Sequence, residues 1–236
     1  RRYRRYRYGR AQDRQASPIP LISARRREAV LMSAEKPRER PILFNDQMVR
    51  AILEGRKTVT RRAVKGLQIP TEDKTTPHEG LRWSALGQRH LRYGFNVFGS
   101  TEEECAHELA RCGVCPVGKP GDRLWVRESF ADIGCRLTFR ADLEDGAHCS
   151  VTRWTPSLHM PRWASRILLE ITAVRVERLQ QITIGEICKE GLARSMYEFI
   201  PVTTAFDAFA ELWNSTGGDW DANPWVWDIE FKRVTP

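Results

Sequence analysis

The side chains best suited to chemistry gather in one short segment, Gly55–Arg62, which reads GRKTVTRR. A helical pattern precedes this segment and a strand pattern begins near Thr58, so it lies at a helix-to-strand corner. Partial burial at such a corner lowers the pKa of a lysine enough for Lys57 to act as a base beside a strand hydroxyl. The candidate residues are Lys57, Thr58, Thr60, Arg61 and Arg62.

A carboxylate far along the chain, Glu190, falls in the last turn of a short predicted helix that begins at Thr183 and stops at Gly191. A negative charge at this end of a helix is unfavourable by roughly a few tenths of a kcal/mol unless it has a cationic partner. Either Lys57 or Arg62 is a candidate partner. The alternative interpretation is that these charges form an ordinary solvent-exposed surface.

Short β segments joined by a few helices must position these groups. Asn45 is a good N-cap, and Thr183 with Glu186 has the spacing of a capping box. The chain lacks a βαβ rhythm, which favours a small mixed barrel over a doubly wound sheet. The expected strands are 40–44, one from 58, 123–130, 165–179 and 225–231, with a hairpin of 135–141 and 149–154. The expected helices follow Asn45 and span 101–111, 183–190 and 204–214.

The corner segment resembles the G-x-K-x-x-[TE]-x-R signature of the ASCH domain, a member of the PUA-like barrel superfamily. The matching residues are Gly55, Lys57, Thr60 and Arg62. Four further segments resemble small bacterial ASCH proteins in the same order along the chain. They are Pro120–Val126, Leu169–Ala173, Thr183–Glu190 and Trp227–Phe231. Together the segments cover about half of residues 40–234, so a single ASCH domain is expected over 40–234.

The resemblance implies an α+β fold: a PUA-like small mixed β-barrel with helices at the connections and a helix-lined cleft. One ASCH branch hydrolyses N(4)-acetylcytidine to cytidine and acetate with a motif Lys, a motif Thr and a helix Glu. These correspond to Lys57, Thr60 and Glu190. The residues expected to contact the substrate are Thr58, Arg61, Arg62 and Trp163. Trp163 would stack on a base at the cleft mouth, and packing in the core or a lid is its alternative role.

The chain also departs from that enzyme, because it is longer and carries a Cys-containing insertion at about 66–118. In this respect it is closer to larger ASCH proteins encoded by phages and prophages. The expected partner is a nucleoside or RNA, and the most concrete activity is amide hydrolysis of an N-acylated cytidine-type substrate. The alternatives are a non-catalytic RNA or modified-base binding module and a ribonuclease. No cofactor is expected.

The basic character of the chain is confined to its first residues. Ten of the 38 basic and two of the 30 acidic residues lie in 1–31, which leaves 28 of each and a net charge of zero for the remainder. Residues 1–39 are expected to be a disordered basic N-terminal extension, and Met32 opens an ordinary-looking sequence. The alternatives for this extension are a nucleic-acid-binding arm and a transit peptide. The neutral remainder favours a small substrate over long-range capture of RNA.

Six cysteines occur without a secretory hydrophobic segment, which predicts reduced thiols and a cytoplasmic location. Cys112 and Cys115 have the spacing of a zinc knuckle, but no second pair accompanies them, so they are weak candidates for structural zinc. Their alternative role is that of small hydrophobic side chains. No apolar run is long enough for a membrane span, and no membrane partner is expected.

Overall fold

The computed structural model describes residues 37–72, 74, 80–87, 94–134, 136–145, 151–199 and 203–235. The contacts between these residues join Pro37–Pro236 into one compact unit. Nearly all of the predicted basic extension, residues 1–36, lies outside the described residues.

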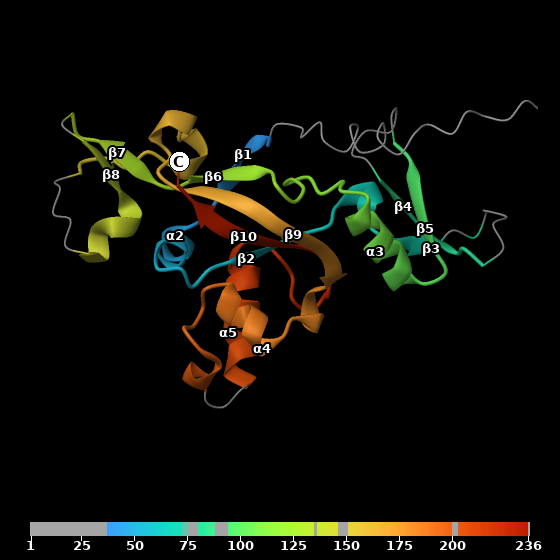
Figure 1. The fold of residues 1–236 in the computed structure, drawn as a ribbon. Helices are drawn as coiled ribbons and strands as arrows, with labels where there is room; N and C mark the ends of the chain where they lie inside the picture. The colour runs from blue at the N-terminus through green and yellow to red at the C-terminus, as the bar shows by residue number, and fades with distance from the viewer. Residues whose placement is uncertain are drawn as a thin grey trace, which may run out of the picture. The chain divides into compact units, whose positions relative to one another are not determined.

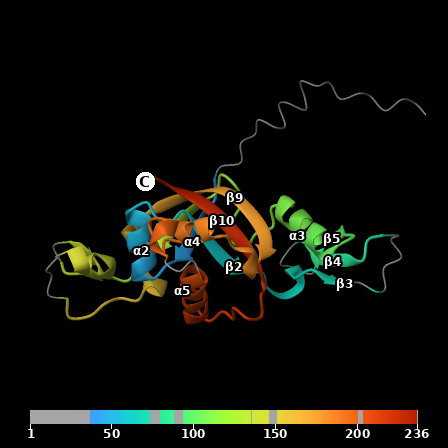
Figure 2. The same cartoon turned by 90° about the horizontal axis from the view of Figure 1, so that it is seen from below.

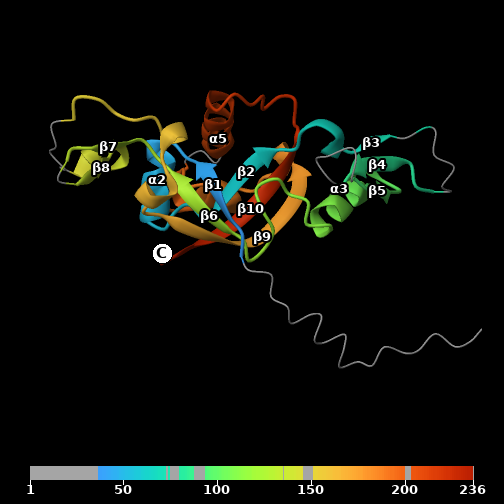
Figure 3. The same ribbon diagram turned by 90° about the horizontal axis from the view of Figure 1, so that it is seen from above.

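A five-stranded sheet forms the centre of this unit (Figures 1 and 3). In spatial order its strands are β1 (Glu39–Leu43), β6 (Arg123–Arg127), β9 (Leu168–Arg178), β10 (Trp225–Val234) and β2 (Val59–Ala63). The β1–β6 pair is parallel and the other pairs are antiparallel. Strand β2 is therefore an edge strand, paired with β10 alone in this sheet.

Both faces of β10 are buried, and its period-two pattern divides its side chains between two hydrophobic clusters. Trp225, Trp227, Ile229 and Phe231 join the main core. Val226 packs on the opposite face beneath α4 (Ile184–Lys189) and α5 (Thr203–Ser215). Seen from below in Figure 2, these two helices lie against β10 and β2.

Local cap signals account for where the helices start. The Asn45 side chain accepts a hydrogen bond from the Met48 N–H at 2.8 Å, at the start of α2 (Asp46–Leu53). At the start of α4, the Thr183 and Glu186 side chains form the predicted capping box. Helix α5 spans Thr203–Ser215 and turns Phe209 and Trp213 into the cluster beneath the sheet.

The segment predicted as an insertion has secondary structure of its own. It contains a three-stranded sheet of β3 (Thr71–Glu72), β4 (Trp83–Leu86) and β5 (Asn96–Gly99), followed by α3 (Glu102–Arg111). Although it is an insertion in the sequence, this segment contributes to the main hydrophobic core. Val97, Leu109 and Cys115 are buried in the same cluster as the central sheet, because the apolar face of α3 also packs on β9.

A two-stranded sheet pairs β7 (Phe130–Asp132) with β8 (Leu137–Phe139). This corrects the expected hairpin of 135–141 with 149–154. Strand β8 turns back on the residues that precede it, and Thr155 forms only an isolated bridge to Phe130. Residues 146–150 lie outside the described residues, and so does the last residue of the turn predicted at 144–146. Short 3₁₀ turns complete the chain: η1 (Gly66–Gln68), η2 (Arg140–Asp145), η3 (Ser157–His159), η4 (Arg162–Ala164), η5 (Leu179–Gln181) and η6 (Met196–Glu198).

The α+β class is confirmed, with helices interspersed among three antiparallel or mixed sheets. Within the described ranges, however, the central sheet is not closed, because β1 and β2 form its two edges and do not pair with each other. Each helix in these ranges is too short or too polar to cross a bilayer.

Candidate functional site

The corner that carries Lys57 is held by backbone hydrogen bonds to two helices. Helix α2 ends at the left-handed Gly55, and the N–H groups of Arg56 and Lys57 both donate to the Ala51 carbonyl, at 2.8 and 3.0 Å. The Thr58 N–H then donates to the Lys189 carbonyl at the end of α4, at 2.8 Å. Two segments far apart in the sequence are thereby fastened together where Lys57 and Glu190 meet.

Lys57 and Glu190 form a buried ion pair. The Lys57 Nζ lies 2.5 Å from Glu190 Oε2 and 3.0 Å from the Glu190 backbone carbonyl, and the two side chains are only 0% and 4% exposed. Burial lowers the pKa of Lys57 below its ordinary value, and the Glu190 carboxylate offsets part of this effect. The ammonium therefore satisfies both the carboxylate and a free carbonyl at the end of α4. Of the two cationic partners considered for Glu190, Lys57 makes the direct contact.

Gly191 allows this close approach. Its backbone has φ +91°, in the left-handed region, and a Cβ at this position would lie 2.7 Å from the Ala51 Cβ and 3.0 Å from the Lys57 Cβ. A glycine after the last helical residue is a common way to end a helix. Here it also leaves the space in which α4 meets the corner after α2.

Arg61 anchors a second charged network next to this pair. It lies opposite Asp228 in the β2–β10 pairing, and Asp228 lies opposite Arg175 of β9, so the three side chains form a row across the sheet. Arg175 Nη2 is 2.8 Å from Asp228 Oδ2. Arg61 Nη1 reaches Glu190 Oε1 at 3.4 Å, which connects the row to the Lys57–Glu190 pair.

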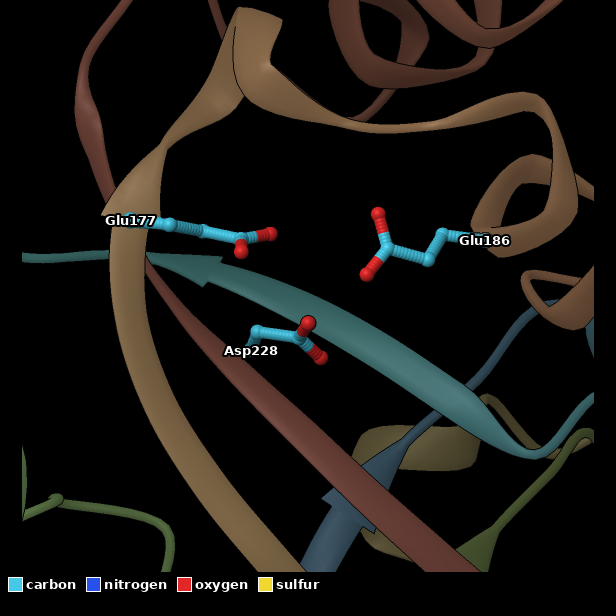
Figure 4. Close-up of side chains that lie close together, drawn as sticks. All are labelled: Glu177, Glu186 and Asp228. Carbon is cyan, nitrogen blue, oxygen red and sulfur yellow. The ribbon is translucent and has the colours of Figure 1, made fainter.

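Glu177, Glu186 and Asp228 approach one another closely enough to hold a metal ion, and they are the one such group among the described residues (Figure 4). Arg61 Nη2 lies 2.7 Å from Glu177, 3.2 Å from Glu186 and 3.2 Å from Asp228. Burial opposes the charge on Arg61, but Asp228, Glu190 and Glu177 outweigh it and raise the pKa of the guanidinium. The guanidinium takes the position that a cation would occupy. The charge of Arg61, which was predicted to contact substrate, is therefore balanced by carboxylates of the protein itself.

Two adjoining hollows open beside these groups. A small recess of about 30 Å³ has Thr60 and Glu190 in its wall, together with α2 and α5 side chains. A larger cavity of about 570 Å³ extends from β2 past η1 and the end of α5. The residues common to both are Arg61, Arg62, Trp213 and Thr216. The recess has the volume of about one water molecule, and the cavity is within the range of ligand-binding pockets.

Arg62 lies at the junction of the two hollows. Its Nη2 donates to the Leu43 carbonyl at 3.0 Å, and its guanidinium carbon lies 5.6 Å from the centre of the Phe44 ring. Burial lowers the pKa of Arg62, and Glu190 opposes this effect in part. The guanidinium of Arg62 therefore lies in the wall of both the recess that Thr60 lines and the larger cavity.

Two of the predicted substrate contacts lie elsewhere. Trp163 is 71% exposed on η4 and lines neither hollow. Thr58 also lines neither hollow, and its backbone forms hydrogen bonds to Lys189 at the end of α4 and to Phe231 of β10. Other lining residues were missed by the sequence analysis, namely Lys65, Trp213, Thr216 and Trp227. The only sequence signal for Lys65 was its position just after the motif strand.

The cysteines do not assemble into a metal site in the described residues. Cys112 and Cys115 belong to no group of three or more ligands there, and Cys135, His148 and Cys149 lie outside the described residues. Burial and the nearby Glu108 raise the pKa of the Cys112 thiol, and burial raises that of Cys105 to about 11.

Comparisons of the chain with protein-family models, with curated proteins and with solved structures give no match.

Proposed function

We propose that this protein is an ASCH-type, PUA-like hydrolase that cleaves the amide of an N-acylated cytidine-type substrate. The observation that carries this proposal is the buried Lys57–Glu190 pair, which lies beside a recess lined by Thr60. The recess shares walls with a cavity large enough for a nucleoside.

Lys57 is suited to the role of the base. Its ammonium is out of water, so its pKa is lowered and the neutral amine forms at a lower pH than in a solvent-exposed lysine. Glu190 holds the side chain in one position and balances its charge while Lys57 carries a proton. Without this partner, burial would lower the pKa of Lys57 further.

The reaction proceeds by addition to the acyl carbonyl carbon. Either the Thr60 hydroxyl attacks, or it positions a water molecule in the recess that attacks, and Lys57 takes the proton of the attacking oxygen. The carbon–nitrogen bond then breaks, and Lys57 gives the proton to the leaving exocyclic amine of cytidine. Water attack releases the carboxylic acid directly, whereas Thr60 attack leaves an acyl ester that a second water hydrolyses. Arg62 is placed to stabilise the oxyanion between these steps.

The binding-module alternative requires Lys57 to contact a phosphate. The Lys57 side chain is fully buried and already paired with Glu190, so it is not available to a phosphate at the surface. This observation favours a catalytic or positioning role for the pair.

The proposal is tested by acetate release from N(4)-acetylcytidine. We expect Thr60→Val and Glu190→Gln to reduce kcat at least about 100-fold, in the range typical of lost acid–base or nucleophile function. Thr58→Val is the matched control, because it is the same substitution two residues away and Thr58 lines neither hollow. Two results would contradict the proposed site. One is loss of activity in the Thr58→Val control alone, and the other is full activity in both Thr60→Val and Glu190→Gln. Shortening of an RNA without acetate release would instead identify a ribonuclease.

A further inference from the structure

The larger cavity has an excess of hydrogen-bond donors and of positive charge. Arg61, Arg62 and Lys65 are among its lining residues, and no Asp or Glu of the described chain is. The remaining polar side chains in its wall are those of Gln68, Trp213, Thr216 and Trp227. The Gln68 amide already donates to the Val114 carbonyl, at 3.2 Å. A cavity of this kind fits a ligand that is rich in acceptors and carries negative charge.

Two of its three cations form no ion pair with a carboxylate of the described residues. Arg61 is neutralised by Glu177, Asp228 and its other carboxylate partners. Arg62, by contrast, contacts a backbone carbonyl and the Phe44 ring, and neither it nor Lys65 forms an ion pair with any carboxylate that the structure describes. Because Arg62 is half-buried and Glu190 balances its charge only in part, an anion bound beside it would stabilise this charge further.

The two indoles supply an independent observation. Trp213 and Trp227 are 8% and 1% exposed, and the Nε1–H group of each is buried without a hydrogen-bond partner in the described residues. The Trp213 Nε1 packs directly against Gly218, which also lines the cavity, so that a Cβ at Gly218 would lie 2.2 Å from it. Buried donors without partners are rare in native proteins, and a shift of the cavity wall on binding would bring these N–H groups within reach of ligand acceptors.

We propose that this cavity binds a phosphate-bearing nucleotide, with the phosphate held by Lys65 and Arg62. This inference rests on the proposed function for the choice of base, and it deepens that function by making the substrate a phosphorylated N-acylcytidine rather than the free nucleoside. A volume of about 570 Å³ accommodates base, ribose and phosphate together. The acyl amide then lies toward the Thr60 recess, and the phosphate toward η1.

Calorimetric binding of cytidine, cytidine 5′-monophosphate and cytidine 3′-monophosphate tests the inference without requiring turnover. We expect at least one monophosphate to bind about tenfold tighter than cytidine at low salt, as a charge-assisted contact predicts. Lys65→Gln reduces that preference to about threefold or less, and higher salt reduces it too. Lys232→Gln is the matched control, because Lys232 is an exposed lysine on β10 outside the cavity and should keep the full preference.

The outcomes separate this inference from the proposed function. Three outcomes would overturn the phosphate site. They are equal binding of all three ligands, a preference for a monophosphate that survives Lys65→Gln, and no binding of any ligand. A Lys65-dependent preference without acetate release from an acetylated nucleotide supports the site and refutes the hydrolase. Acetate release with no phosphate preference refutes the site and leaves the hydrolase in place.

Discussion

Replacing Glu190 with Gln removes the one carboxylate that forms an ion pair with Lys57 in the described structure. The substitution keeps the size of the side chain and leaves Lys57 fully buried. Burial alone then acts on the ammonium, and the pKa of Lys57 falls further below its ordinary value of 10.5. The folded protein avoids an unpaired buried charge by releasing the proton, and this release has a free energy that depends on pH.

The size of this effect follows from the difference between the pH and 10.5. Each pH unit is worth about 1.4 kcal/mol, so complete deprotonation at pH 7.5 destabilises the fold by at most about 4 kcal/mol, and at pH 9.5 by about 1.4 kcal/mol. The sign is set by the unfolded chain, which binds the proton up to pH 10.5 while the folded protein does not. Stability therefore rises with pH between the folded pKa and 10.5. The wild-type protein also carries part of this cost, because the pKa of Lys57 is already lowered there. We therefore expect the free energy of unfolding of Glu190→Gln to be lower than that of the wild type by about 2–4 kcal/mol at pH 7.5 and by about 1 kcal/mol at pH 9.5.

Urea unfolding at these two pH values measures the deficit. The control is the same Glu190→Gln change in a Lys57→Met background, where Arg61 remains the partner of Glu190. In that background the deficit should be small and equal at both pH values. A deficit that does not change with pH, or one of equal size in both backgrounds, would refute the assignment of a buried, charge-dependent pair.

Three further predictions concern the same site. Because neutral Lys57 is the proposed base, kcat/KM should rise with pH and level off at a pKa below 10.5; a profile that falls over pH 6–9 would contradict this role. Gly191→Ala should destabilise the fold by more than the roughly 1–2 kcal/mol that a left-handed alanine costs, because its Cβ would also lie too close to the Ala51 and Lys57 side chains. A loss of about 1 kcal/mol or less in urea unfolding would contradict this close packing. Gly218→Ala should displace the Trp213 indole at a cost of about 1–3 kcal/mol, change its fluorescence and weaken nucleotide binding; unaltered emission and affinity would argue against an indole at the cavity wall.

Local signals predicted the helices and the strands around the site well. Asn45 and Thr183 have side chains that cap the first turns of α2 and α4, and Gly191 has the conformational freedom to end α4. The limits of these helices could therefore be predicted from single residues next to them. The alternation in 225–231 likewise predicted β10. These features depend on interactions within a few residues, which a sequence displays directly.

Features that depend on distant pairing could not be read in the same way. Which strand pairs with β8, and whether the edge strands β1 and β2 meet to close the sheet, depend on contacts between segments that are distant in the sequence. The burial of Leu109 depends on β9. The choice between Lys57 and Arg62 as the partner of Glu190 was open for the same reason, since it depends on how α4 docks beside the corner. Lys65 and the indole donors have roles only because the cavity collects segments that are far apart in the chain.

The walls of the larger cavity come from two sources. Leu86, Pro116 and Val117 belong to the inserted segment, whereas Arg61 and Arg62 lie on β2 and Trp213 lies on α5. The proposed reacting groups are not part of this wall: Thr60 lies on β2, Lys57 on the corner before it and Glu190 at the end of α4. Remodelling the inserted loops would thus alter which molecules are admitted while leaving the reacting groups untouched. Such a division lets selectivity diversify under mutation without the reactive centre having to be rebuilt each time.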